Sequence, residues 1–390
     1  MTRTTILLFA SLSLLPQTPQ TPPPASWQPQ ATGVAVRLRG VSAVSPTVAW
    51  ASGGNGTVLR TIDGGRTWTP RRVPGAERLD FRDVDAMSDR VAYVLSIGPG
   101  DSSRIYKTRD GGAEWTLQFE NNDPKIFLDA MAFVDETLGY TVSDSVDGRL
   151  VILVTSNGGR TWERVADDRL PPALPGEGAF AASGTNVAVF GREHVWIGTS
   201  ASRVIRSSDG GRTWTASATP VATGPATGIF SIAFRDALHG VVVGGNYRQE
   251  SAAVDNVAVT SDGGATWTPV SGRALSGFRS VVAFAPAAGA QSVIAIGPTG
   301  VDWSFDDGRS WTPAAGDGFD TVSLAPHAIV GWAAGQGGRI SKLTLTSRNV
   351  APRRESRSHF CVDRHLGVCP RFQEFGARGR YTRVRTALAR

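Results

Sequence analysis

Cysteine and lysine are scarce in this chain of 390 residues, which contains only two Cys. Both of them, Cys361 and Cys369, lie near the C-terminal end. The preceding 360 residues therefore cannot be held together by a disulfide framework. Long apolar runs are also lacking at the N-terminus, where "MTRTTILLFASLSLL" has a basic start and an apolar stretch too short to span a bilayer permanently.

This N-terminal stretch is typical of a signal peptide, so we expect the protein to be exported to the periplasm or secreted. The following segment "PQTPQTPPPASWQPQ" has the composition of an extended proline-rich spacer. A buried N-terminal strand is the alternative interpretation of that segment. We expect residues 1–26 to contain the signal peptide and the start of the spacer.

A net positive charge is absent from most of the chain as well, although the net charge of the whole is +6. Residues 348–390 carry eleven Arg against three acidic residues, so the remainder of the chain has a net charge of −2. No basic stripe on a folded body is indicated, and we expect no nucleic-acid partner. We expect residues 347–390 to form a disordered, Arg-rich tail.

The tail also places His359, Cys361, His365 and Cys369 close together. An exported chain can oxidise the two Cys, and the four side chains are also compatible with zinc. Their spacing does not match a standard zinc finger, and a mobile tail without either feature is the simpler interpretation. We therefore expect no metal and no cofactor.

What is abundant is Gly (45 residues), Pro (23 residues) and a repeat. "TIDGGRTWTP" at 61–70 returns in similar form five times, and its Trp residues are separated by 47, 47, 52, 53 and 44 positions. This period is typical of four-stranded propeller blades. The sequence thus predicts an all-β protein with turn residues between short strands.

Residues 27–346 are expected to form a seven-bladed β-propeller, with six or eight blades as alternatives. The first repeat aligns with the second without a gap, 38–51 over 81–94, and the third follows at 128–141. After the sixth box, "FDTVSLAPHAIVGWAAGQGGRISKLTL" supplies only three strands. We expect "ATGVAVRL" at 31–38 to complete this last blade, because an unpaired sheet edge invites association.

Five of the six boxes have an Asp or Asn directly before Gly, and in every box a Trp with a neighbouring Thr follows. A short polar side chain accepts turn N–H groups, Gly provides positive φ, and Trp covers the hairpin. A structural role is favoured over metal or sugar binding, because Asn157 and Asp307 alter the pattern without an evident compensating ligand. The residues concerned are Asp63, Asp110, Asn157, Asp209, Asp262 and Asp306 with Trp68, Trp115, Trp162, Trp214, Trp267 and Trp311.

The pattern S/T-x-D-G-G-x-T-W resembles the Asp-box, or BNR, repeat of sialidases and related propellers. The fuller pattern "AFVDETLGYTVSDSVDGRLVILVTSNGGRTW" is most similar to exported propellers of the photosystem II stability and assembly factor family. This resemblance covers residues 31 to about 346. It implies a non-enzymatic, monomeric scaffold that binds a protein or peptide client, including a membrane protein.

A sialidase-like glycoside hydrolase is the alternative. The resemblance would then require an arginine triad, an Asp acid and a Tyr nucleophile paired with Glu. The Arg-Ile-Pro signature is absent, and only Tyr247, in "GGNYRQES" with Arg248 and Glu250, is placed suitably. No catalytic residue is therefore assigned.

In the assembly-factor family a basic patch near one face of the ring is associated with client binding. The gapless alignment places Arg39 over Arg82, and the pair "FR" returns at Arg279. Because first strands begin at a channel mouth, these three Arg form the candidate client-binding patch. Tyr247 and Arg248, in the long loop 244–256, are secondary candidates.

Overall fold

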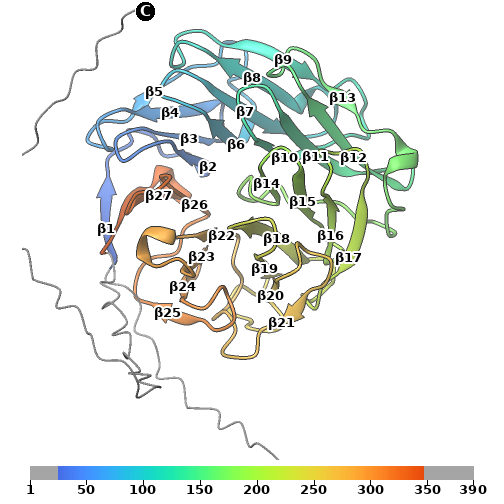
Figure 1. The fold of residues 1–390 in the computed structure, drawn as a ribbon. Helices are drawn as coiled ribbons and strands as arrows, with labels where there is room; N and C mark the ends of the chain where they lie inside the picture. Colours follow the sequence, from blue (N-terminus) through green and yellow to red (C-terminus); the bar gives the residue numbers. More distant parts are fainter. Residues whose placement is uncertain (1–24, 347–390) are drawn as a thin grey trace, which may run out of the picture. The chain divides into compact units, whose positions relative to one another are not determined.

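The computed structural model describes residues 25–346, whose strands form seven antiparallel sheets of four strands each. Figure 1 displays the sheets around a common centre, with the first strand of each innermost. The seven-bladed all-β propeller expected from the repeat is confirmed. Within residues 25–346, no helix has the length and apolar character needed to cross a membrane. The segments expected to be a signal peptide and an Arg-rich tail are outside the described residues, except for Ala25 and Ser26 of the first.

The first four blades follow the chain order. They are blade 1 with β2 (Leu38–Ala43), β3 (Ala49–Gly53), β4 (Thr57–Thr61) and β5 (Thr69–Pro70); blade 2 with β6 (Asp80–Ala86), β7 (Ala92–Ile97), β8 (Arg104–Thr108) and β9 (Thr116–Glu120); blade 3 with β10 (Leu128–Phe133), β11 (Gly139–Val146), β12 (Arg149–Thr155) and β13 (Glu163–Arg164); and blade 4 with β14 (Val187–Phe190), β15 (His194–Gly198), β16 (Arg203–Ser207) and β17 (Thr215–Ala218).

Two further blades continue this order, and the last combines both ends of the described chain. They are blade 5 with β18 (Thr227–Phe234), β19 (Gly240–Asn246), β20 (Val257–Thr260) and β21 (Thr268–Pro269); blade 6 with β22 (Val281–Phe284), β23 (Val293–Gly297), β24 (Gly300–Ser304) and β25 (Thr312–Ala314); and blade 7 with β26 (Thr321–Leu324), β27 (Val330–Ala334), β28 (Ile340–Leu345) and β1 (Ala25–Gln30). Short 3-10 turns lie at Gly100–Ser102, Asp167–Arg169, Pro286–Ala288 and Gln336–Gly338.

The ring is closed by an N-terminal strand, but its expected position at 31–38 is wrong. β1 (Ala25–Gln30) pairs with β28, from Ala25 opposite Leu345 to Gln30 opposite Ile340. This strand is the outermost of blade 7, so the chain needs residues 31–37 to travel from the rim to the innermost strand β2. Pro29 is tolerated because an edge strand has no further partner for the missing N–H.

Gln30 joins the last blade to the first. Its Oε1 accepts hydrogen bonds from the indole N–H groups of Trp68 (2.9 Å) and Trp332 (3.1 Å). Its Nε2 donates to the carbonyl oxygen of Gly64 at 3.1 Å. One side chain thus satisfies groups of both blades at the point where the ring closes.

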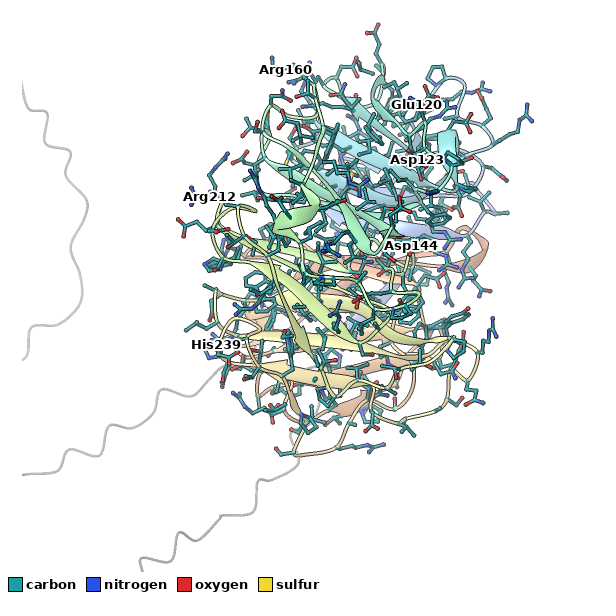
Figure 2. The ribbon with its side chains drawn as sticks, turned by 90° about the vertical axis from the view of Figure 1, so that its right-hand side faces the viewer. Glu120, Asp123, Asp144, Arg160, Arg212 and His239 are labelled. Carbon is teal, nitrogen blue, oxygen red and sulfur yellow. The ribbon has the colours of Figure 1, made fainter. Side chains whose placement is uncertain are left out.

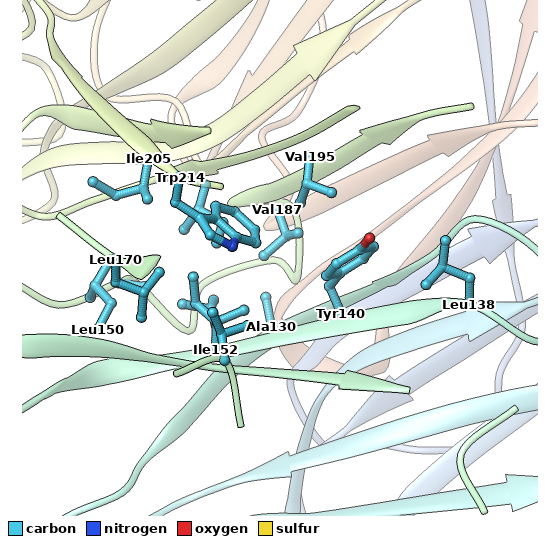
Figure 3. Close-up of a cluster of buried hydrophobic side chains, with 14 residues drawn as sticks. Ala130, Leu138, Tyr140, Leu150, Ile152, Leu170, Val187, Val195, Ile205 and Trp214 are labelled. Atoms are coloured by element: carbon cyan, nitrogen blue, oxygen red, sulfur yellow. The ribbon is translucent and has the colours of Figure 1, made fainter. Parts of the chain in front are cut away.

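The hydrophobic core lies between neighbouring blades. Figure 3 displays one such cluster, in which Tyr140 and Ile152 of blade 3 and Trp214 of the next Asp-box lie together. The Tyr140 and Trp214 rings meet edge to face at 6.4 Å. The Trp of each box is therefore not confined to its own hairpin, since it also packs on the preceding blade.

The Asp-box turns are held by internal hydrogen bonds. In the first box, Asp63 Oδ1 accepts from the Thr67 backbone N–H (3.0 Å) and Asp63 Oδ2 from the Thr67 hydroxyl (2.7 Å). The Thr61 hydroxyl accepts from the Gly65 N–H at 2.8 Å. The carboxylate is thereby engaged within the turn, as a structural role requires.

The two faces of the ring carry different parts of the blades. Figure 2 views the ring from its edge, with the box residues Arg160 and Arg212 on one face and Asp123 and Asp144 on the opposite face. We call the first the box face. The second is the mouth face, because the innermost strands begin there.

Candidate functional site

β-bulges set the residues that reach the centre of the mouth face. The pairing of β2, β6, β10 and β18 with their neighbours shifts by one residue, which leaves Arg39, Arg82, Asp129 and Phe230 unpaired in the ladder. A bulge bends its strand and redirects the extra side chain. Arg39, Arg82 and Phe230 line a common cavity.

This mouth cavity has a volume of about 480 Å³. Arginines occupy one side and aromatic side chains another. It is lined by Arg37, Arg39, Arg82, Phe180, Ala181, Ala182, Phe230, Tyr247, Glu250, Phe278, Ser280, Pro298 and Asp320. Blades 1, 2, 5, 6 and 7 and the loop that enters blade 4 all contribute to it, so the cavity exists only in the closed ring.

The three arginines differ in how fully they are neutralised. Arg37 forms a bidentate pair with Asp320, with Nε–Oδ2 at 2.8 Å and Nη2–Oδ1 at 2.5 Å. This hydrogen-bonded partner raises the pKa of Arg37. Arg82 bonds to Asp80 at 2.9 Å and to the carbonyl oxygen of Ala181 at 2.6 Å.

Arg39 has no carboxylate partner within residues 25–346. The only hydrogen bond that its side chain makes with this part of the chain goes to the carbonyl oxygen of Ala182 at 3.3 Å. Burial, and then the neighbouring charge of Arg82, lower the pKa of Arg39 to about 10. A half-buried guanidinium beside two others is stabilised by an anion.

The aromatic side consists of stacked rings. Phe180 lies parallel to Phe230 with 3.8 Å between ring centroids, and Phe278 meets Phe230 edge to face at 4.7 Å. The ring of Tyr247 adds a further edge contact at 6.0 Å from Phe230. The cavity therefore combines a charged and an apolar surface.

Residues 180–185 of the loop that enters blade 4 cross the channel. We call them the cross-channel segment. Their partners come from four other blades. The carbonyl oxygens of Ala182 and Ala181 accept hydrogen bonds from Arg39 and Arg82, respectively. The Ser183 hydroxyl donates to the Ser280 carbonyl oxygen at 2.8 Å, and the Thr185 hydroxyl donates to the Ser231 hydroxyl at 2.8 Å.

The cross-channel segment separates the mouth cavity from a second chamber of about 420 Å³ that opens toward the box face. Phe180, Ala181 and Ala182 line the first, and Ser183, Gly184 and Thr185 line the second. Among the described residues, none lines both. The cross-channel segment is therefore the boundary between the two cavities.

Arg279 does not join the other two arginines of the expected patch. It precedes β22, whose pairing with β23 shows no bulge, and it is only 1% exposed. Its guanidinium binds the Asp302 carboxylate at 2.6 Å inside the blade. The pair "FR" occurs at both 278–279 and 81–82, but Arg279 precedes its strand whereas Arg82 lies on a bulge within its strand.

The two secondary candidates, Tyr247 and Arg248, differ in their position relative to the mouth cavity. Tyr247 lines the mouth cavity, whereas Arg248 is an exposed residue that lies 5.7 Å from the Tyr247 ring and does not line it. Sequence reasoning missed Arg37, Phe180, Phe230 and Phe278. Phe230 occupies the same bulge position as Arg39, so a register-based alignment finds it, but no sequence signal marks Phe180 in its long loop.

No group of three or more His, Cys, Asp or Glu side chains suited to a metal ion gathers within residues 25–346.

Comparison with known proteins agrees with the fold. Residues 80–227 match the family model of Photosynthesis system II assembly factor YCF48. No curated protein matches the chain.

Three solved structures illustrate the similarity. YCF48 bound to D1 peptide has a TM-score of 0.59 and 17% identity, covering 82% of this chain and 97% of the other. YCF48 from Cyanidioschyzon merolae has a TM-score of 0.60 and 19% identity, covering 82% and 98%. The WD40 β-propeller domain of Doa1 has a TM-score of 0.55 and 11% identity, covering 82% and 97%. The chain is therefore a seven-bladed Asp-box β-propeller similar to the photosynthesis system II assembly factor YCF48.

Proposed function

We propose that this protein is a non-enzymatic scaffold that binds a protein or peptide client, with an acidic part of the client in the mouth cavity. The observation that carries the proposal is Arg39, a half-buried guanidinium whose sole hydrogen-bond partner in the described chain is a carbonyl oxygen. A carboxylate accepts two parallel N–H bonds from arginine, which a carbonyl does not. The neighbouring Phe180 and Phe230 provide an apolar surface for the residues beside that carboxylate.

The solved YCF48 structure contains a D1 peptide, which supports a peptide as the class of ligand. The acidic group is our inference from the arginines of this chain. We further propose that the protein works in the periplasm or outside the cell, on the basis of its first fifteen residues.

Binding of a fluorescent peptide with alternating Asp and Phe tests the proposal, with the Asn counterpart as reference. We expect the Asp peptide to bind more tightly, and Arg39→Gln or Arg82→Gln to weaken its binding about tenfold, because a charge-assisted hydrogen bond contributes about 1.5–3 kcal/mol. Fluorescence anisotropy measures both affinities.

The matched control is Arg90→Gln, an exposed arginine just beyond the other end of β6. It should bind the Asp peptide as the unmodified protein does. Equal affinity for the Asp and Asn peptides, or no effect of both mouth substitutions, contradicts the proposal.

The hydrolase alternative rests on Tyr247 and Glu250 lining the same cavity as three arginines. No hydrogen bond joins the Tyr247 hydroxyl to Glu250 among the described residues, and the ring packs on Phe180 and Phe230. We expect no release from a chromogenic sialoside. Release that Tyr247→Phe abolishes would replace the scaffold proposal by an enzyme.

A further inference from the structure

A third cavity, of about 730 Å³, adjoins the mouth cavity on the mouth face. The two share Phe180. It is formed by the tops of blades 3 and 4 and the loop that leads into blade 5, and is lined by Asp144, Ser145, Leu174, Pro175, Gly176, Glu177, Gly178, Ala179, Phe180, Ser200, Ala201, Thr223, Gly224 and Pro225. Asp144 lies on the face that Figure 2 displays at its right. We call this the acidic cavity.

Among residues 25–346, no lysine, arginine or histidine lines the acidic cavity. Its two carboxylates have different roles. Glu177 is 1% exposed, and its carboxylate pairs with the Arg203 guanidinium and accepts hydrogen bonds from the Thr199 hydroxyl (2.8 Å) and the Leu174 N–H (2.8 Å). Asp144 uses one oxygen to accept from the Ala179 N–H at 3.1 Å and has no cationic partner in the described chain.

A buried carboxylate lies beside Asp144. The strand pairing leaves Asp129 of β10 and Asp144 of β11 unpaired on either side of the Leu128–Ser143 pair. Asp129 is 2% exposed, and its Oδ2 has no hydrogen-bond partner in the described part of the chain. The nearby Arg82 is already bonded to Asp80 and Ala181.

An unpartnered buried carboxylate is costly in its charged form. Burial and the charge of Asp144 raise the pKa of Asp129 well above its usual range, which favours its neutral, protonated form. Asp144, which lines the cavity and has an oxygen without a hydrogen-bond partner among the described residues, is therefore the carboxylate available to a cation.

We propose that the acidic cavity binds an ammonium or guanidinium group through Asp144. The occupant is a lysine or arginine side chain of the client, and this identification rests on the proposed function. The client therefore presents an acidic and a basic group to neighbouring cavities of opposite charge, on either side of Phe180. Such a pair gives orientation as well as affinity.

Fluorescence anisotropy of dansylcadaverine, measured with the full chain, tests the cation site directly. The neutral reference probe is N-pentyl dansylamide, which has the same ring and chain length but no amine. We expect the amine to bind at least fivefold more tightly than the neutral probe, and Nα-acetyl-lysine amide, but not Nα-acetyl-norleucine amide, to displace it.

Asp144→Asn should remove the preference for the amine. Asp317→Asn, at a carboxylate 78% exposed in its side chain, is the matched control and should retain it. Thermal unfolding verifies that each variant is folded. Equal binding of the two probes, or a preference that survives Asp144→Asn, overturns the proposal.

The same probes separate this inference from the proposed function. Arg39→Gln weakens the acidic peptide but should leave dansylcadaverine binding unchanged or stronger. Loss of the amine preference with intact, Arg39-dependent peptide binding refutes the acidic cavity alone. An intact amine preference with no Arg39-dependent peptide binding refutes the acidic client and leaves the cation site standing.

Discussion

Single residues of the Asp-boxes connect neighbouring blades. The carbonyl oxygen of Gly158 accepts from Lys107 of the preceding blade at 2.9 Å, and that of Gly263 accepts from the Trp196 indole at 2.8 Å. Asp307 replaces this Gly in the sixth box. Its carboxylate instead pairs with Arg235 of the preceding blade at 2.8 Å, so an ion pair takes over the connection and no external ligand is required.

Arg235→Met should destabilise the protein by about 2–3 kcal/mol, because it leaves the Asp307 carboxylate, 5% exposed in its side chain, without its closest cation. The double variant with Asp307→Gly should recover most of the loss. Gly also suits the left-handed backbone there, where Asp307 has φ of 59°. Urea unfolding of both variants provides the measurement.

Arg66→Met is the control, since Arg66 is exposed in the first box and, within residues 25–346, its side chain bonds only to the backbone of its own turn. It should change stability by less than about 0.5 kcal/mol. If the double variant is as unstable as the single one, the connection between the blades does not depend on this ion pair.

At the scale of strands, the repeat predicts blade number and phase because each box marks the same turn. It does not predict bulges, which depend on hydrogen-bond register and not on residue type. Arg39 and Arg279 both follow an apolar residue, yet only Arg39 lies on a bulge and reaches the mouth cavity. The cross-channel segment likewise depends on contacts with four distant blades that no local pattern encodes.

The expected position of the closing strand, at 31–38, is also wrong for a physical reason. Its composition in "ASWQPQ" includes Pro29, which indicates a spacer when hydrogen-bonding partners are unknown. Trp27 and Gln30 give the strand its place, through the stacked Phe319 ring at 5.4 Å and the two indole groups of blades 1 and 7.

A chain that begins at Ala31 should be markedly less stable than one that begins at Ala25. It lacks β1, which leaves β28 as an unpaired edge and the Trp68 and Trp332 indole groups without their acceptor. We also expect concentration-dependent association, since an exposed edge strand pairs with other chains. Thermal unfolding and light scattering measure the two effects.

Gln30→Leu is a milder variant for the case in which the shorter chain does not fold. It retains the strand and removes only the side-chain bonds, at an expected cost of about 1–3 kcal/mol for each indole left unsatisfied. Unchanged unfolding midpoints for both variants would mean that blade 7 holds without its N-terminal strand.

At the scale of the whole molecule, two sets of carboxylates have opposite effects of pH on stability. In the box turns, the backbone N–H and hydroxyl of Thr67 lower the pKa of Asp63 to about 2, and the hydroxyl and N–H of Thr213 do the same for Asp209. Their contribution is present above about pH 4 and is lost as the pH falls toward 2. Beside the channel, burial raises the pKa of Asp85 to about 6 despite the bond from the Phe133 N–H.

Between about pH 4 and 6 the folded state binds the Asp85 proton and the unfolded state has released it, so stability falls as the pH rises. Asp83, whose pKa is also raised by burial, acts in the same direction. We therefore expect the unfolding temperature to be highest near pH 4–5, with a loss from Asp85 of up to about 3 kcal/mol by pH 8. Asp85→Asn keeps an acceptor for the Phe133 N–H and cannot ionise, so it should reduce the decline between pH 5 and 8. An equal decline in the variant would assign the pH dependence to other groups and would mean that this carboxyl ionises in the folded ring without cost.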